Sequence, residues 1–139
     1  MSRSIERLSL HRRRRIFALA EHFGIEGFLC ATTVTTIDYL LGRCIPVSDA
    51  RKAIGKLLQL FEIAPVNRPV LEQTLLSRIS DFEDAVLEQS GLLVGADVIV
   101  TRNTRDFMNA SIPALEPDKL LSMINKDLEN GTEPKERNP

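Results

Sequence analysis

The stretch that decides the fold is residues 81–107, which reads DFEDAVLEQSGLLVGADVIVTRNTRDF. Its first half predicts a helix, because Ser80 and Glu83 have the spacing of a capping box and Gly95 can end the helix in the left-handed conformation. The run Val98-Ile99-Val100 that follows is β-branched and too short for a helix, which is typical of a strand buried on both faces. The sequence therefore predicts a helix, a tight turn and a buried strand.

Oxygen-bearing side chains gather at one end of this predicted unit. Asp81 and Asp84 are three residues apart, so they are neighbours on the first turn of the helix. Thr101, Asn103 and Asp106 follow the carboxyl end of the strand, which is where open parallel sheets bind ligands. Such a group of oxygens suits a hard cation such as Mg²⁺, which takes a few carboxylates and keeps several waters.

Strands and helices alternate along the rest of the chain, which favours an α/β domain with a parallel sheet covered on both faces. We expect this single domain to span residues 1–129, followed by a polar, disordered tail over 130–139. The predicted helices outside the opening stretch are residues 4–23, 37–41, 48–58, 68–75 with Asn67 as its N-cap, and 117–128. The predicted strands are residues 28–31, 61–66 and 112–115.

The composition excludes several classes of protein. The chain has 139 residues and a net charge of -1, so no overall basicity indicates nucleic acid binding. It lacks a signal peptide and any run of about 18 apolar residues, which predicts a cytoplasmic protein without membrane contact. Cys30 and Cys44 lie in apolar surroundings without metal-site spacing, so we expect reduced structural thiols.

One local cluster is basic. Arg12, Arg13, Arg14 and Arg15 are consecutive within the first predicted helix. They could bind RNA phosphates or an acidic partner, but adjacent residues on a helix point in different directions and a charge run is usually a solvated face. Both interpretations stay open.

Three motifs carry a resemblance to a known family. They are DFEDA over residues 81–85, GADVIVTRNTRDF over 95–107 and IPALEP over 112–117. In this order and spacing they resemble PIN domains, the fold of many metal-dependent ribonucleases, including toxins of the VapC type from toxin–antitoxin pairs. Weaker similarity extends back to Arg15, so it covers most of the chain.

The resemblance implies a three-layer α/β fold with a central, mostly parallel sheet flanked by helices. It also implies one or two Mg²⁺ or Mn²⁺ ions that activate water for attack on the phosphodiester of single-stranded RNA. Asp84 and Asp106 match motif positions and are the expected metal ligands and catalytic residues. Asp81, Thr101 and Asn103 would support them, and Arg102 within the motif would contact RNA or a partner.

The chain departs from the family pattern at two acidic positions. PIN domains begin with a strand that ends in a metal-binding aspartate, and this chain has no such strand. A glutamate frequent in the helix after the second strand is matched here by Thr36, with Asp38 two residues later. We therefore expect weak metal binding, and repulsion between the remaining carboxylates that raises the pKa of one of them.

The missing first strand would leave two strand edges open in the middle of the sheet, between the strands predicted over residues 28–31 and 97–101. We therefore expect an altered sheet, or a homodimer that compensates.

Three interpretations of function follow. One is a PIN-type ribonuclease, such as a toxin with an antitoxin partner, acting through Asp84 and Asp106. The second is a noncatalytic PIN-like module that binds RNA or a protein. The third is that the true start lies upstream of Met1, where an in-frame apolar strand ending in aspartate would restore the enzyme.

Overall fold

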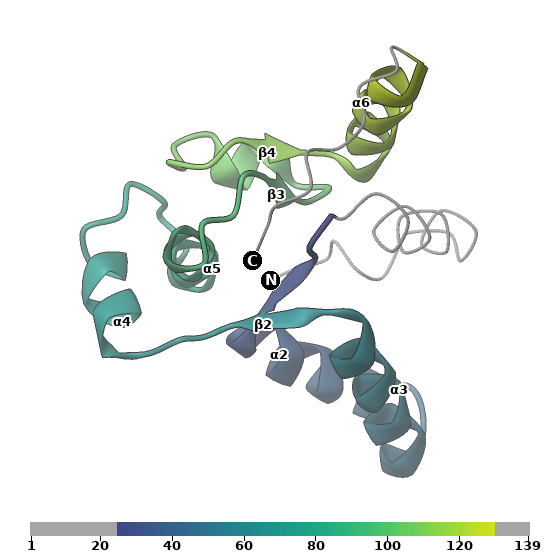
Figure 1. Ribbon diagram of the computed structural model, residues 1–139. Helices are drawn as coiled ribbons and strands as arrows, with labels where there is room; N and C mark the ends of the chain where they lie inside the picture. The colour runs from purple at the N-terminus through teal and green to yellow at the C-terminus, as the bar shows by residue number, and fades with distance from the viewer. Residues whose placement is uncertain (1–24, 130–139) are drawn as a thin grey trace.

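The computed structural model describes residues 25–129. The predicted first helix with Arg12, Arg13, Arg14 and Arg15, and the predicted tail over 130–139, lie outside the described residues. The described elements are β1 (Phe28–Cys30), α2 (Ala31–Gly42), α3 (Val47–Leu60), β2 (Glu62–Ala64), α4 (Arg68–Thr74), α5 (Phe82–Leu93), β3 (Ile99–Val100), the 3₁₀ helix η1 (Thr104–Phe107), β4 (Ala114–Leu115) and α6 (Pro117–Glu129). The alternation of strands and helices confirms the α/β class (Figure 1).

The strands form two separate parallel pairs. β1 pairs with β2, in the register that places Leu29 beside Ile63, and β3 pairs with β4, in the register that places Ile99 beside Ala114. Within the described part of the chain, β1 and β3 do not pair with each other. Among residues 25–129 the expected central sheet is therefore divided into two strand pairs, and both strands of each pair have one unpaired edge.

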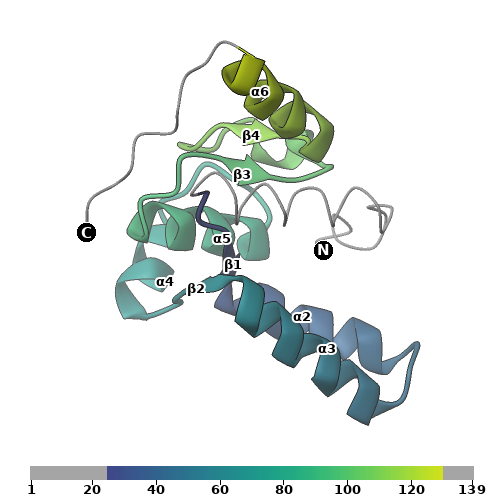
Figure 2. The ribbon, with the colours of Figure 1, turned by 45° about the vertical axis from the view of Figure 1, so that its right-hand side comes forward.

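Helices lie on both sides of the first pair. α2 and α3 form a hairpin on one side of β1 and β2, and α4 and α5 lie on the other side (Figures 1 and 2). The Arg51 Nε donates to Asp38 Oδ1 at 3.0 Å and so links the two helices of the hairpin. α6 follows β4 at the far end of the molecule from this hairpin (Figure 2).

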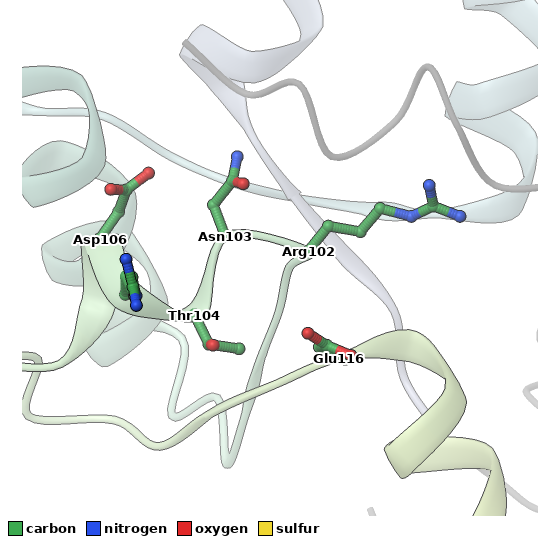
Figure 3. A pocket seen from close by; sticks show the side chains of 6 residues that line it. Arg102, Asn103, Thr104, Asp106 and Glu116 are labelled. Carbon is green, nitrogen blue, oxygen red and sulfur yellow. The ribbon is translucent and has the colours of Figure 1, made fainter.

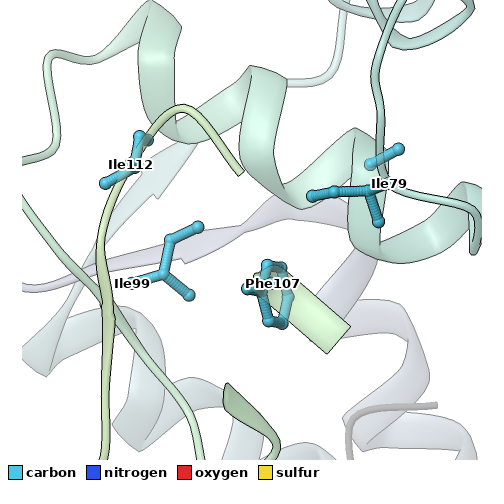
Figure 4. Packing of buried hydrophobic residues seen from close by; sticks show 5 residues of the cluster. Ile79, Ile99, Phe107 and Ile112 are labelled. Atoms are coloured by element: carbon cyan, nitrogen blue, oxygen red, sulfur yellow. The ribbon is translucent and has the colours of Figure 1, made fainter. Parts of the chain in front are cut away.

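α5 carries the contacts that hold the two halves together. Its Ala85 packs in a buried cluster with Ile79, Ile99, Phe107 and Ile112 beside the second strand pair (Figure 4). The next residue, Val86, packs instead with Cys30 of β1 and Val70 of α4. Leu87 packs against both clusters, so α5 is the helix on which both strand pairs pack.

Two predicted helix starts were wrong. α2 begins at Ala31 rather than near Ile37, because the Thr35 hydroxyl donates to the Thr32 carbonyl at 2.7 Å and so fits the first turn of a helix. α5 has Asp81 rather than Ser80 at its N-cap, where Asp81 Oδ1 accepts a hydrogen bond from the Asp84 N–H at 2.9 Å. The expected capping box is therefore not formed.

Two burial predictions were also wrong. Ile99 is buried but Val100 is 44% exposed, because neighbouring strand residues point to opposite faces and only one face of β3 is packed within the described region. Cys30 is buried whereas Cys44 is exposed, at the end of the α2–α3 hairpin. Both cysteines are free thiols, as expected.

The turn between α5 and β3 follows the prediction. Gly95 has a φ of +70°, the left-handed conformation that ends the helix at little cost only when the residue lacks a Cβ. The chain then reaches β3 within a few residues. This short connection places the residues after β3 near the first turn of α5, and so sets up the candidate site.

No helix among residues 25–129 is long and apolar enough to cross a membrane.

Candidate functional site

Asp84 is the most constrained acid in the candidate site. It lies in the first turn of α5 and is only 9% exposed. Burial raises its pKa, and the nearby carboxylates of Asp81, Asp106 and Glu83 raise it further. No described residue donates a hydrogen bond to its carboxylate. A buried carboxylate without a donor is costly, so this group needs a proton or a cation.

The charges of Asp106 and Asp81 both act on this buried acid. Asp106 is exposed in η1, and it is close enough to Asp84 for its charge to raise the pKa of that residue. Asp81 is also exposed, but one of its oxygens serves the helix as the N-cap. The structure thus brings Asp84, Asp106 and Asp81 into one electrostatic group, in which Asp81 has a structural task as well.

Thr101 and Asn103 form the loop that leads from β3 to η1. Thr101 is buried, and its hydroxyl accepts a hydrogen bond from the Asn103 N–H at 3.1 Å. This bond fixes the turn after the strand. The Asn103 side chain points to the same side of the loop as Asp106 (Figure 3). Thr101 therefore shapes the site, and Asn103 presents an amide to it.

Glu83 was not among the predicted site residues. The Thr36 hydroxyl donates to its Oε1 at 3.2 Å, so the carboxylate is held against α2, and its charge acts on Asp84. Thr36 is the position that resembles a family glutamate, and here it holds a carboxylate from another helix. A pattern local to α5 could not reveal a contact between residues 47 positions apart.

A shallow pocket of about 330 Å³ opens beside Asp106. It is lined by Arg102, Asn103, Thr104, Arg105, Asp106 and Glu116 (Figure 3). The Arg102 side chain extends away from Asp106, so a basic group and an acidic group lie at different ends of the loop. Arg105 and Glu116 are further residues that sequence reasoning missed, and Glu116 reaches the loop residues because β4 pairs with β3.

The acids fit a divalent cation only in part. Within residues 25–129, no three Asp, Glu, His or Cys side chains are placed to hold a metal ion together. Carboxylate and amide oxygens are nevertheless the ligands that Mg²⁺ prefers, and Mg²⁺ commonly uses one or two carboxylates and keeps several waters. The residues that would hold such an ion are Asp84 and Asp106, with Asn103 nearby.

Comparisons with known proteins bear on the family. Neither the curated proteins nor the solved structures include a significant match to this chain. A family model described as PIN domain matches residues 4–105, well over half of the 139 residues. PIN domains are generally nucleases and typically use divalent metals. The match, together with the α/β architecture and parallel strand pairs, establishes that the chain belongs to the PIN domain family.

Proposed function

We propose that the chain is a Mg²⁺- or Mn²⁺-dependent endoribonuclease that cleaves single-stranded RNA in the cytoplasm. The observation that supports this most strongly is the Asp84 carboxylate, which is buried without a hydrogen-bond donor among the described residues and lies in the field of Asp106. A cation bound between these acids would remove the cost of burying the charge. Because only two carboxylates would hold the ion, we expect metal binding to be weak.

Each residue of the candidate site has a role that follows from its position. Asp84 and Asp106 would hold the ion. When bound, the ion would lower the pKa of a coordinated water and neutralise charge on the phosphate. Asn103 is placed to donate a hydrogen bond to a phosphate oxygen from its amide. Arg102, at the other end of the loop, would hold a neighbouring phosphate of the RNA.

The test is RNA cleavage by the purified chain, followed on a fluorescent single-stranded RNA with Mn²⁺ and with EDTA. We expect cleavage with Mn²⁺ only, and a loss of about 10- to 100-fold for Asp106→Asn, since this removes one ligand charge but keeps the shape. Asp49→Asn, at an exposed aspartate of α3, is the matched control. Equal cleavage by wild type and Asp106→Asn would show that Asp106 has no part in the reaction.

A second candidate is a noncatalytic PIN-like module that binds RNA or a protein. The unpaired edges of β1 and β3 favour it, because open strand edges are templates for pairing with another chain. The partner would be a second copy of this chain, or an antitoxin if the protein is the toxin of a toxin–antitoxin pair. RNA binding without cleavage would support this candidate.

A homodimer that uses these edges should dissociate on dilution. Sedimentation velocity between about 1 and 100 µM, the range in which protein contacts of moderate affinity dissociate, should show a shift from dimer to monomer. A single monomeric species at every concentration would contradict the dimer. The same runs with added RNA separate self-association from association on RNA.

A further inference from the structure

The pocket beside the candidate site contains a carboxylate that the proposed nuclease does not use. Glu116 is the residue immediately before α6, and its backbone carbonyl accepts the Leu120 N–H at 3.1 Å. Its side chain lines the pocket together with Arg102 and Arg105 (Figure 3). Arg102 follows β3 and Glu116 follows β4, and the ends of these two strands are adjacent because the Thr101 N–H donates to the Leu115 carbonyl at 3.0 Å.

The two arginines suit an anion. Neither Arg102 nor Arg105 forms an ion pair with an acid in the described part of the chain, although Asp106 and Glu116 line the same pocket. A guanidinium presents N–H donors in a fork that matches phosphate oxygens. On the proposed function, the phosphate is that of the RNA chain that approaches Asp84 and Asp106.

A carboxylate in a pocket that binds phosphate weakens that binding, unless the carboxylate itself receives a hydrogen bond from the ligand. Its charge repels each passing phosphate, and a carboxylate acts only as an acceptor when ionised. The backbone of DNA offers no hydrogen-bond donor, whereas each ribose of RNA carries a 2′-hydroxyl that can donate. The same carboxylate therefore weakens the binding of DNA, whereas it can accept a hydrogen bond from a 2′-hydroxyl of RNA.

We propose that Glu116 is a specificity residue, which accepts a hydrogen bond from a ribose 2′-hydroxyl while Arg102 and Arg105 hold the phosphates on either side of it. This inference rests on the proposed function, since it names what distinguishes the nucleic acid accepted at that site. It assigns the pocket one nucleotide unit of single-stranded RNA. Its consequence is a preference for RNA over DNA that depends on Glu116 and not on the arginines.

The experiment measures binding without cleavage. Fluorescence anisotropy with labelled single-stranded RNA and DNA of matched sequence, in EDTA and at fixed salt, gives two dissociation constants for each variant. We expect wild type to prefer RNA by about tenfold, the scale of one hydrogen bond to a charged group. Glu116→Gln should bind DNA more tightly and reduce this ratio toward one, because it removes the repulsion but keeps the shape.

Two further variants separate charge from recognition. Arg105→Gln should weaken RNA and DNA equally and leave the ratio unchanged, since a phosphate contact does not read the sugar. Glu62→Gln, at an exposed glutamate of β2, should match wild type. An RNA-to-DNA ratio that is the same in Glu116→Gln and wild type overturns the inference, as does wild type that binds neither nucleic acid.

The outcome is independent of catalysis. If the chain never cleaves RNA but its preference for RNA depends on Glu116, the inference holds and the ribonuclease proposal fails. If the chain cleaves RNA with Mn²⁺ and Glu116→Gln leaves the ratio intact, the ribonuclease proposal holds and the inference fails.

Discussion

Replacing Asp84 with asparagine should reduce RNA cleavage by at least about 100-fold while making the protein more stable at neutral pH. The loss of activity follows because Asp84 is the buried member of the pair that would hold the ion, and even outer ligands of metal sites cost up to about 100-fold when removed. The gain in stability follows because the variant no longer buries a carboxylate that lacks a hydrogen-bond donor within the described region.

The stability gain should depend on pH in a defined direction. The pKa of Asp84 is raised in the folded protein above its ordinary value of 3.8 by burial and by the carboxylates of Asp81, Asp106 and Glu83. The folded state therefore binds this proton more tightly than the unfolded state does. The stabilisation from protonation is complete below pH 3.8 and is lost as the pH rises through the raised pKa.

Thermal melts of wild type and Asp84→Asn between pH 4 and pH 8 test this expectation. The difference in melting temperature should be small at the acidic end and grow in favour of the variant as the pH rises. Added Mn²⁺ should raise the melting temperature of wild type and leave the variant nearly unchanged, because bound ions stabilise the state that binds them. A difference that grows toward acid pH, or equal cleavage by both proteins, would contradict the role assigned to Asp84.

The second large effect concerns Glu88, a buried glutamate of α5 that is 2% exposed. Its Oε1 accepts hydrogen bonds from the Ser77 hydroxyl and the Gln89 Nε2, both at 2.8 Å. Its Oε2 accepts the Ser111 N–H at 2.9 Å. One carboxylate thus connects α5 to the segment before it and to the loop before β4.

We expect Glu88→Ala to lower the free energy of unfolding by about 3 kcal/mol. The substitution removes the acceptor of the partly buried hydrogen bonds from the Ser77 hydroxyl and the Ser111 N–H, and a hydrogen bond to a charged group contributes about 1.5–3 kcal/mol. Glu88→Gln should cost less, because the amide keeps one acceptor oxygen. Urea unfolding measures both, with Glu72→Ala at an exposed position of α4 as control, expected within about 0.5 kcal/mol of wild type. Similar losses for Glu88→Ala and Glu72→Ala would show that these hydrogen bonds contribute little.

Local signals in the sequence were sufficient for most elements. The predicted Asn67 cap is confirmed, since Asn67 Oδ1 accepts the Val70 N–H at 3.2 Å, and Gly95 ends α5 in the left-handed conformation as expected. Each depends on residues only a few positions apart. The α5 cap was misplaced by one residue because Ser80 and Asp81 are both good N-caps, and the Glu83 side chain expected in the capping box accepts a hydrogen bond from Thr36 of α2.

Features that depend on distant pairing were harder to predict. The division into two strand pairs was anticipated only as an altered sheet, because strand pairing is decided by contacts between segments far apart in the chain. Arg105 and Glu116 looked like ordinary surface charges until the β3–β4 register placed them around one pocket. Whether Asp84, Asp106 and Asn103 act together on RNA stays a prediction for the cleavage experiment.

The position of α5 has a consequence for how the protein opens and folds. Leu87 is shared by two clusters that otherwise have no buried residue in common, so the described region consists of two cooperative units joined along one helix. We therefore expect either strand pair to separate from α5 while the buried residues of the other cluster stay packed. Slow amide hydrogen exchange should therefore concentrate in α5, and local opening of β3 and β4 should leave the exchange rates of β1 and β2 unchanged.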